Sequence, residues 1–162
     1  MAAENQFDSM DYRIVQALTR DARIPFSRLA DQLNVSNSLI HQRVRKLQDA
    51  GLLTDAVYQV DTEKLGYETS AYCQIILTHG QALQAVVEEL RKIPEIVECV
   101  NIAGRYAIMV KLFTINNSHL RDIVYDKIQT IDGVEGTNTV MSFETAFSRS
   151  VAIPGIKNEN DT

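Results

Sequence analysis

The order of strand-like and helix-like patterns between residues 71 and 143 constrains the fold of this 162-residue chain more than any other feature. Four segments are rich in residues that favour strands, namely 71–78, 96–103, 106–113 and 134–143. Apolar residues recur at helical spacing over 81–92 and again after Ser118. Gly104-Arg105 predicts a tight turn that joins the second and third strands as a hairpin. The order β-α-β-β-α-β predicts a ferredoxin-like motif.

The strands of this predicted motif do not alternate cleanly between apolar and polar residues. In such a motif both helices pack on one face of the sheet, so the other face has no cover of its own. A sheet with two apolar faces buries the second face against a partner. We therefore expect the chain to form dimers through the open face of the sheet.

The first 54 residues carry the spacing of three short helices. Asp8 is placed to cap the first helix, and Asn34 to end the second in a left-handed conformation. Ser36 is a good N-cap for the third helix, and the apolar residues Val35 and Ile40 around it have the spacing of a hydrophobic staple. Two short helices joined by such a tight turn predict a helix-turn-helix.

The third helix, predicted over Ser36–Asp49, has a polar stripe opposite its apolar face. It contains no acidic residue before its last position, although the whole chain has a formal net charge of −5. The major groove of DNA accommodates such a helix and displays a distinct set of donors and acceptors for each base pair. Arg45 suits guanine and Gln42 suits adenine, whereas Arg43 and Lys46 suit phosphates. The candidate DNA-binding residues are Ser36, Asn37, Ser38, His41, Gln42, Arg43, Arg45 and Lys46.

The residue pattern alone leaves other functions to weigh. A three-helix module of this kind also serves for packing or for contacts with protein. An enzyme is disfavoured, because the histidines are scattered, none of them are paired at the spacing of a helical metal site, and the sequence has no glycine-rich phosphate loop. We therefore expect no catalytic residues, no metal and no cofactor.

The cysteines and the start of the chain bear on the compartment. Cys73 and Cys99 are too few for a disulfide scaffold and fit small buried core residues in a reducing cytosol. They fall on the first and second strands, which are not neighbours in this topology, so we expect neither a disulfide nor a shared metal. The sequence has no signal-peptide pattern, and no apolar run reaches the roughly 18 residues of a membrane helix. We expect a cytoplasmic protein with no membrane partner.

These patterns divide the chain into four parts. We predict an α+β protein with an N-terminal helix-turn-helix (winged-helix-like) domain and a C-terminal ferredoxin-like βαββαβ domain. The boundaries are 1–54 for the helix-turn-helix domain, 55–69 for a linker with a short strand, 70–154 for the ferredoxin-like domain and 155–162 for a flexible polar tail.

Several segments, in this order, resemble the Lrp/AsnC family of transcription regulators over roughly residues 7–154. Asp11–Ile24 (DYRIVQALTRDARI) is similar to the opening helix of that family. Ser36–Leu47 (SNSLIHQRVRKL) resembles its recognition helix, and Cys99–Leu112 (CVNIAGRYAIMVKL) resembles the second and third strands of its ligand-binding domain. Each motif is weak alone, but their order and spacing together are specific.

The resemblance implies a regulator of double-stranded DNA that forms dimers and associates further, often into an octamer, around its C-terminal domains. It also implies a small effector, usually an amino acid, that binds between subunits near the Gly104 turn and the last strand. Effector binding would alter how DNA is wrapped or bent, which implies a nucleoid-associated protein. The candidate effector-binding residues are Ile102, Ala103, Gly104, Arg105, Tyr106, Ala107, Thr137, Thr139 and Met141.

The turn after Gly104 departs from the family pattern. The family usually has Tyr-Asp or Phe-Asp there, whereas this chain has Tyr106-Ala107, and Arg105 adds a positive charge. One hypothesis is that Arg105 recruits a more anionic ligand or reaches a neighbouring subunit; a solvated turn arginine is the simpler interpretation. The missing aspartate also keeps an alternative function open, that of an effector-independent architectural DNA-binding protein.

Overall fold

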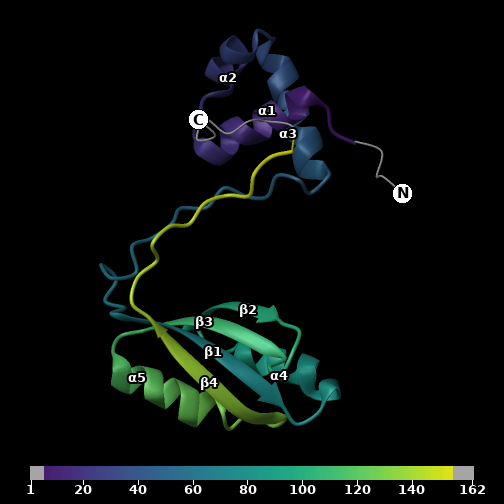
Figure 1. Ribbon diagram of the computed structural model, residues 1–162. Helices are drawn as coiled ribbons and strands as arrows, with labels where there is room; N and C mark the ends of the chain where they lie inside the picture. Colours follow the sequence, from purple (N-terminus) through teal and green to yellow (C-terminus); the bar gives the residue numbers. More distant parts are fainter. Residues whose placement is uncertain (1–5, 155–162) are drawn as a thin grey trace. The chain divides into compact units, whose positions relative to one another are not determined.

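The computed structural model describes residues 6–154 of the chain. Its contacts divide these residues into two compact units (Figure 1). The first unit combines residues 6–58 with residues 148–154, and the second comprises residues 59–147. No helix among the described residues has the length and apolar character that crossing a membrane requires.

The first unit contains three helices, α1 (Ser9–Arg20), α2 (Phe26–Leu33) and α3 (Asn37–Asp49). The predicted caps are confirmed. Asp8 and Asp11 form a capping box at α1, and Asn34 ends α2 with a φ of 54°. Ser36 caps α3, because its hydroxyl oxygen accepts the Leu39 N–H at 3.2 Å. The apolar faces of the three helices meet in one buried cluster of Ile14, Val15, Leu29, Ala30, Ile40, Val44 and Leu47.

The segment between the units differs from the sequence prediction. We expected a short strand within 55–69, but residues 55–68 form no strand, and the first strand starts at Thr69. Within the described chain this segment has no partner strand, and an unpaired strand leaves its N–H and C=O groups without a ladder. Residues 148–154 also group with the first unit, whereas the sequence pattern placed them at the end of the second domain. Ile153 packs there against the helical cluster, which sequence periodicity did not indicate.

The second unit has the predicted β-α-β-β-α-β order (Figure 1). Its elements are β1 (Thr69–Leu77), a short 3₁₀ turn η1 (Gly80–Ala82), α4 (Leu83–Leu90), β2 (Ile96–Asn101), β3 (Ile108–Thr114), α5 (Asn117–Asp122), its π-helical continuation η2 (Ile123–Ile128) and β4 (Val134–Ser142). The strands form one antiparallel sheet in the order β2-β3-β1-β4. The ferredoxin-like topology is therefore confirmed.

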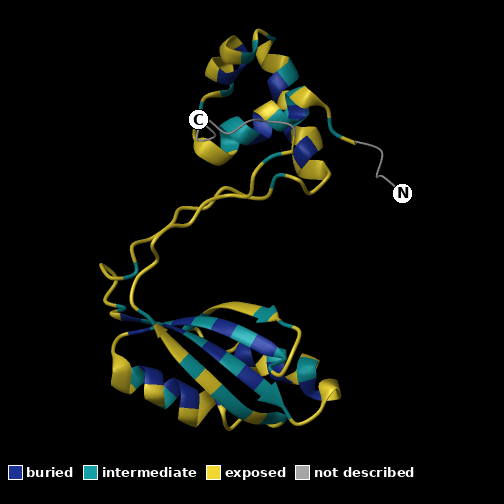
Figure 2. Cartoon of the chain, in the orientation of Figure 1, coloured by how far each residue is buried: buried dark blue, intermediate teal, exposed yellow. Residues whose placement is uncertain are grey.

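The helices of the second unit cover one face of the sheet. Buried residues alternate with more exposed ones along β1 and β3, as the colours of Figure 2 show. The covered face of the sheet packs against α4, α5 and η2 in a core that includes Ala71, Cys73, Ile75, Val86, Leu90, Ile108, Val110, Leu112, Leu120, Ile123 and Ile128.

The opposite face of the sheet mixes apolar and polar side chains. Lys111 lies over the rings of Tyr72 and Phe113, and Asn138 Nδ2 donates to Gln74 Oε1 at 2.9 Å. Val140, which pairs with Tyr72, leaves 55% of its surface exposed. The second unit as described places no helix over this face.

The two cysteines occupy different environments. Cys73 is fully buried, as expected, and burial raises the pKa of its thiol. The expectation that Cys99 is buried is wrong, because β2 is an edge strand and Cys99 is exposed. Strands β1 and β2 are separated by β3, so the prediction that the two cysteines lie on non-neighbouring strands is confirmed.

Candidate nucleic-acid interface

The exposed side of α3 carries the polar stripe that the sequence predicted. Asn37, Ser38, Gln42 and Arg45 are exposed, whereas the opposite side of the helix is buried in the first-unit cluster. The Arg45 side chain is 83% exposed, and its Nε lies 4.0 Å from Asp49 Oδ2 at the weak limit of an ion pair. This stripe can therefore present donors and acceptors to a ligand without rearrangement of the helix.

Two members of the predicted set, Ser36 and His41, have structural contacts as well. The Ser36 hydroxyl caps α3 and lies 3.1 Å from the Ser38 hydroxyl. The His41 ring packs edge-on against Phe26, with ring centroids 4.8 Å apart. His41 thus helps to hold α3 against α2.

Arg43 and Lys46 are tied to the start of α1. Arg43 Nη1 and Lys46 Nζ each lie 2.9 Å from a carboxylate oxygen of Asp11, and Arg43 also pairs with Asp8. The Asp11 side chain has no exposed surface. A buried carboxylate needs such partners, because an unpaired buried charge is costly. These ion pairs fix α3 against α1 and join residues that are 32 and 35 positions apart in the sequence.

The same contacts perturb the titration of these groups. Burial by itself raises the pKa of Asp11, but hydrogen bonds from Lys46 and Arg43 outweigh it and hold that pKa below its ordinary value. The hydrogen bond from Arg43 lowers the pKa of Asp8, and the two carboxylates raise the pKa of Arg43. Asp8, Asp11 and Arg43 are therefore charged at neutral pH. Asp11 has no role of its own in the sequence analysis, although its position three residues after Asp8 is the spacing of a capping box.

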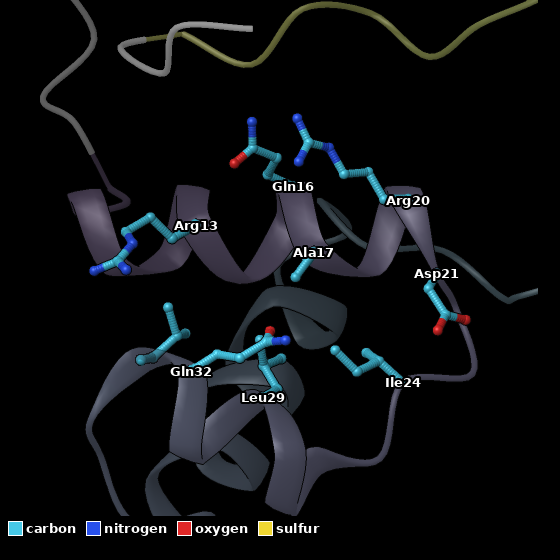
Figure 3. A pocket seen from close by; sticks show the side chains of 9 residues that line it. Arg13, Gln16, Ala17, Arg20, Asp21, Ile24, Leu29 and Gln32 are labelled. Carbon is cyan, nitrogen blue, oxygen red and sulfur yellow. The ribbon is translucent and has the colours of Figure 1, made fainter. Parts of the chain in front are cut away.

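A separate groove of about 340 Å³ lies between α1 and α2 (Figure 3). Its polar lining residues include Arg13, Gln16 and Arg20 of α1 and Gln32 of α2. Ala17, Ile24 and Leu29 supply apolar lining. No residue of α3 contributes to its lining, so this groove is distinct from the polar stripe.

The structure brings together most of the candidate effector residues of the second unit. The Ile102 N–H donates to Ala107 O at 2.9 Å, and the Ala107 N–H donates to Ile75 O at 3.0 Å. Ile75 pairs on its other side with Thr137 of β4, so the turn and β4 meet at the same end of β1. Gly104 adopts a φ of 125°, a conformation that a residue with a Cβ atom rarely takes.

Two details of this region differ from the candidate set. Met141 pairs with Ala71 and lies four residues beyond Thr137 along β4, at about 13 Å. Gln129 was not among the candidates, but its Nε2 donates to the Thr137 hydroxyl at 2.7 Å. Gln129 could be identified only from the contact between the end of η2 and β4, and sequence periodicity does not predict such a contact.

Comparisons with known proteins agree with this architecture. The family model of the AsnC-type helix-turn-helix domain matches residues 7–48. The model described as the Lrp/AsnC ligand binding domain matches residues 70–152. The first match covers α1, α2 and all of α3 except its last residue, and the second covers the sheet of the second unit from Ser70 onward.

Individual relatives match over nearly the whole chain. The regulatory protein AsnC of Haemophilus influenzae is 32% identical over 91% of this chain and 98% of its own length. The structure of E. coli AsnC has a TM-score of 0.84 and 31% identity, and the match covers 90% of this chain and 97% of that one. The feast or famine regulatory protein of M. tuberculosis, solved in complex with L-methionine, has a TM-score of 0.83 and 25% identity over 91% of this chain and 99% of that one. With both domains matched in order, the chain belongs to the Lrp/AsnC family of helix-turn-helix transcription regulators.

Proposed function

We propose that this regulator reads its DNA sites with the exposed stripe of α3 and responds to a small effector, such as an amino acid, at its second unit. The observation that carries the DNA-binding part is the arrangement of α3. Its apolar side and its ion pairs with Asp11 fix the helix, while Arg45 and Gln42 stay exposed. A fixed helix with free base-reading side chains is what entry into the major groove requires.

The residues of α3 divide into three roles in this proposal. Arg45 pairs with guanine and Gln42 with adenine, and Asn37 and Ser38 contact bases or phosphates. Lys46 keeps 45% of its side chain exposed, and because its ammonium donates to Asp11 and to Gln6 O, one of its three N–H donors is left for a phosphate. We propose that Ser36, His41 and Arg43 also contact DNA phosphates, in addition to the structural contacts that they make within the first unit.

Assembly of several chains completes the regulator. We propose that the uncovered face of the sheet forms a dimer, in which two α3 helices reach half-sites about 34 Å apart or a multiple of it. Further association into an octamer would let DNA wrap around the particle. Such a protein works where the chromosome is, so we place it in the cytoplasm in association with the nucleoid.

The effector site is proposed at the 102–107 turn together with Thr137, Thr139 and Met141. Support comes from the shared position of the turn and Thr137 beside Ile75 and from the methionine complex of the M. tuberculosis relative. Ala107 stands where a carboxylate is usual, which favours a second candidate function, an architectural DNA-binding protein that is indifferent to effectors.

The DNA-binding proposal is tested by selecting a binding sequence from a random DNA pool and measuring affinity for it by fluorescence anisotropy. Replacing Arg45 by alanine should weaken binding by about 1–3 kcal/mol, or roughly 5- to 150-fold, if it contacts a base. Arg91→Ala, which removes an exposed arginine of the second unit, is the matched control and should have no effect. Unchanged affinity in Arg45→Ala would remove this residue from base readout, and no binding by the unaltered chain would contradict the proposed function.

The effector proposal is tested by a thermal-shift screen against the twenty amino acids at millimolar concentration. A ligand present at about 100 times its Kd adds about 2.7 kcal/mol to the stability of the native state. A clear shift with one or a few amino acids identifies the effector class despite Ala107. No shift with any amino acid would favour the architectural function instead.

A further inference from the structure

The C-terminal part of the described chain returns to the first unit and lies over a cavity there. Residues 148–154 are called the strap, and its residues 150–154 line a space of about 440 Å³ together with α1, α2, α3 and residues 52–56. Ile153 of the strap packs against the apolar cluster that also holds α3 in place. Every residue that lines this cavity belongs to the first unit.

Ile153 anchors the strap through an apolar contact. Ile153 is partly buried against the cluster, whereas Val151, two residues earlier, is 88% exposed. A cavity remains beneath the strap instead of a packed layer. A cavity lined by apolar atoms forfeits packing contacts, so this segment is held less firmly than the helices it covers.

The strap covers residues that pack the recognition helix against the rest of the first unit. Val44, one of the buried residues of α3, lines the cavity with Val15 and Leu18 of α1. Release of the strap would expose this apolar lining and remove a contact from the side of α3 opposite its polar stripe. The stability of α3 against local opening therefore depends on whether Ile153 is docked.

The strap also follows directly from the proposed effector strand. Strand β4 ends at Ser142, and the strap begins six residues later at Ser148. Thr137 and Thr139, which belong to the proposed effector site, lie on the same strand. A change in the position or order of β4 therefore acts on the strap through a short covalent connection.

We propose that residues 148–154 are a releasable strap that holds α3 when it is docked through Ile153, and that β4 controls its docking. This proposal rests on the proposed function for its biological meaning, because it gives the effector strand a route to the DNA-binding helix. The docking itself is independent of DNA and can be measured without it.

The docking is tested by hydrogen exchange of the α1 and α3 amides in the full chain. Ile153→Asp places a charge in the apolar cluster, and we expect exchange in α3 to rise at least tenfold while exchange in β1 and β3 stays unchanged. Val57→Asp is the matched control, since Val57 belongs to the same unit, is 82% exposed and does not line the cavity, and it should leave α3 unchanged. If Ile153→Asp does not fold, Ile153→Ala is measured, with a smaller rise expected. Unchanged exchange in α3 for the folded Ile153 variant overturns the proposal.

The coupling to β4 is tested with a four-residue Gly-Ser insertion between Phe147 and Ser148. The probe is the amino acid with the largest thermal shift in the screen of twenty. We expect this amino acid to change α3 exchange in the unaltered chain at least threefold, and the insertion to abolish that response while its binding persists. An unaltered response in the insertion variant overturns the coupling.

The same measurements separate the two proposals. If no amino acid binds, the effector function and the coupling both fail, but the docking result with Ile153→Asp still stands. If the unaltered chain binds no DNA, the proposed DNA function fails while the exchange data still decide whether the strap holds α3.

Discussion

The recognition helix of the first unit and the 102–107 turn of the second unit carry the two proposed binding surfaces, and the chain holds them in different ways. Helix α3 is fixed within its own unit by a buried apolar side, a capping hydroxyl and ion pairs to Asp11. The turn is fixed at its two ends by backbone hydrogen bonds of Ile102 and Ala107, while Gly104 and Arg105 between them are exposed. The unit that carries the turn also has an uncovered sheet face.

This difference indicates whether one chain is enough to form each binding surface. The DNA-binding stripe is finished within one chain, because its supporting charges are all paired inside the first unit. The sheet face and the turn expose groups such as Val140 and Arg105 that a second chain can cover. Substitutions should therefore act on folding in the first region and on association in the second.

The largest expected effect breaks the support of the recognition helix. Asp11→Ala leaves Arg43 and Lys46 without their buried carboxylate and removes half of the capping box. Because both cations are partly exposed, we expect a loss of about 2–3 kcal/mol in the free energy of unfolding of the first unit. Urea denaturation followed by circular dichroism measures it. Asp49→Ala, which removes an exposed carboxylate at the end of α3, should change stability by less than about 0.5 kcal/mol, and equal losses in both variants would refute the role of the buried ion pairs.

A second, slightly smaller effect concerns association through the sheet. Val140→Asp places a charge on the uncovered face, and we expect it to weaken dimer formation by about 2 kcal/mol, roughly thirtyfold. Sedimentation equilibrium measures the dimer Kd. The control is Ile115→Asp, because Ile115 has nearly the same exposure, 54% against 55%, but lies outside the strands. If Val140→Asp associates as tightly as the control, the open face is not the interface.

The smallest expected effect is a dependence of the stability of the first unit on pH. The pKa values of Asp8 and Asp11 are lower in the folded chain than their ordinary value of 3.8, so the ionised carboxylates stabilise the fold. This stability is fully present well above pH 3.8 and is lost as pH falls through the lower folded-state pKa values. After correction for the intrinsic exchange rate, which itself falls in acid, the protection of the α1 and α3 amides should therefore drop on acidification, and Asp11→Asn should flatten that drop. A drop of equal size in the variant would show that other groups control acid unfolding.

Local signals in the sequence predicted much of the fold. Asp8, Asn34 and Ser36 end or begin helices through contacts within three or four residues, which spacing rules describe well. The β-α-β-β-α-β order followed from periodicity, because the covered face of each strand and helix is marked by apolar residues. The exposed part of the α3 stripe followed in the same way.

Contacts between distant residues account for what the sequence did not predict. The pairing of Arg43 with Asp11 joins residues 32 positions apart, and each residue alone had a simpler local interpretation. Cys99 is exposed because the strand order places β2 at an edge of the sheet. The residues of a single strand do not show which place that strand takes in the sheet. Ile153 reached the helical cluster from the far end of the chain, where no local pattern identifies a partner.

The packing of residues 148–154 against the first unit has a consequence for folding during synthesis on the ribosome. Synthesis proceeds from the N-terminus, and domains generally fold as units as they emerge. The three helices of the first unit leave the ribosome before the second unit, but Ile153, which packs against them, is made only after β4. The cavity beneath it stays open until residues 148–154 have been made. A chain that stops before Ile153 therefore carries an incomplete DNA-binding unit, and completion of that unit requires that the second unit has already been synthesised.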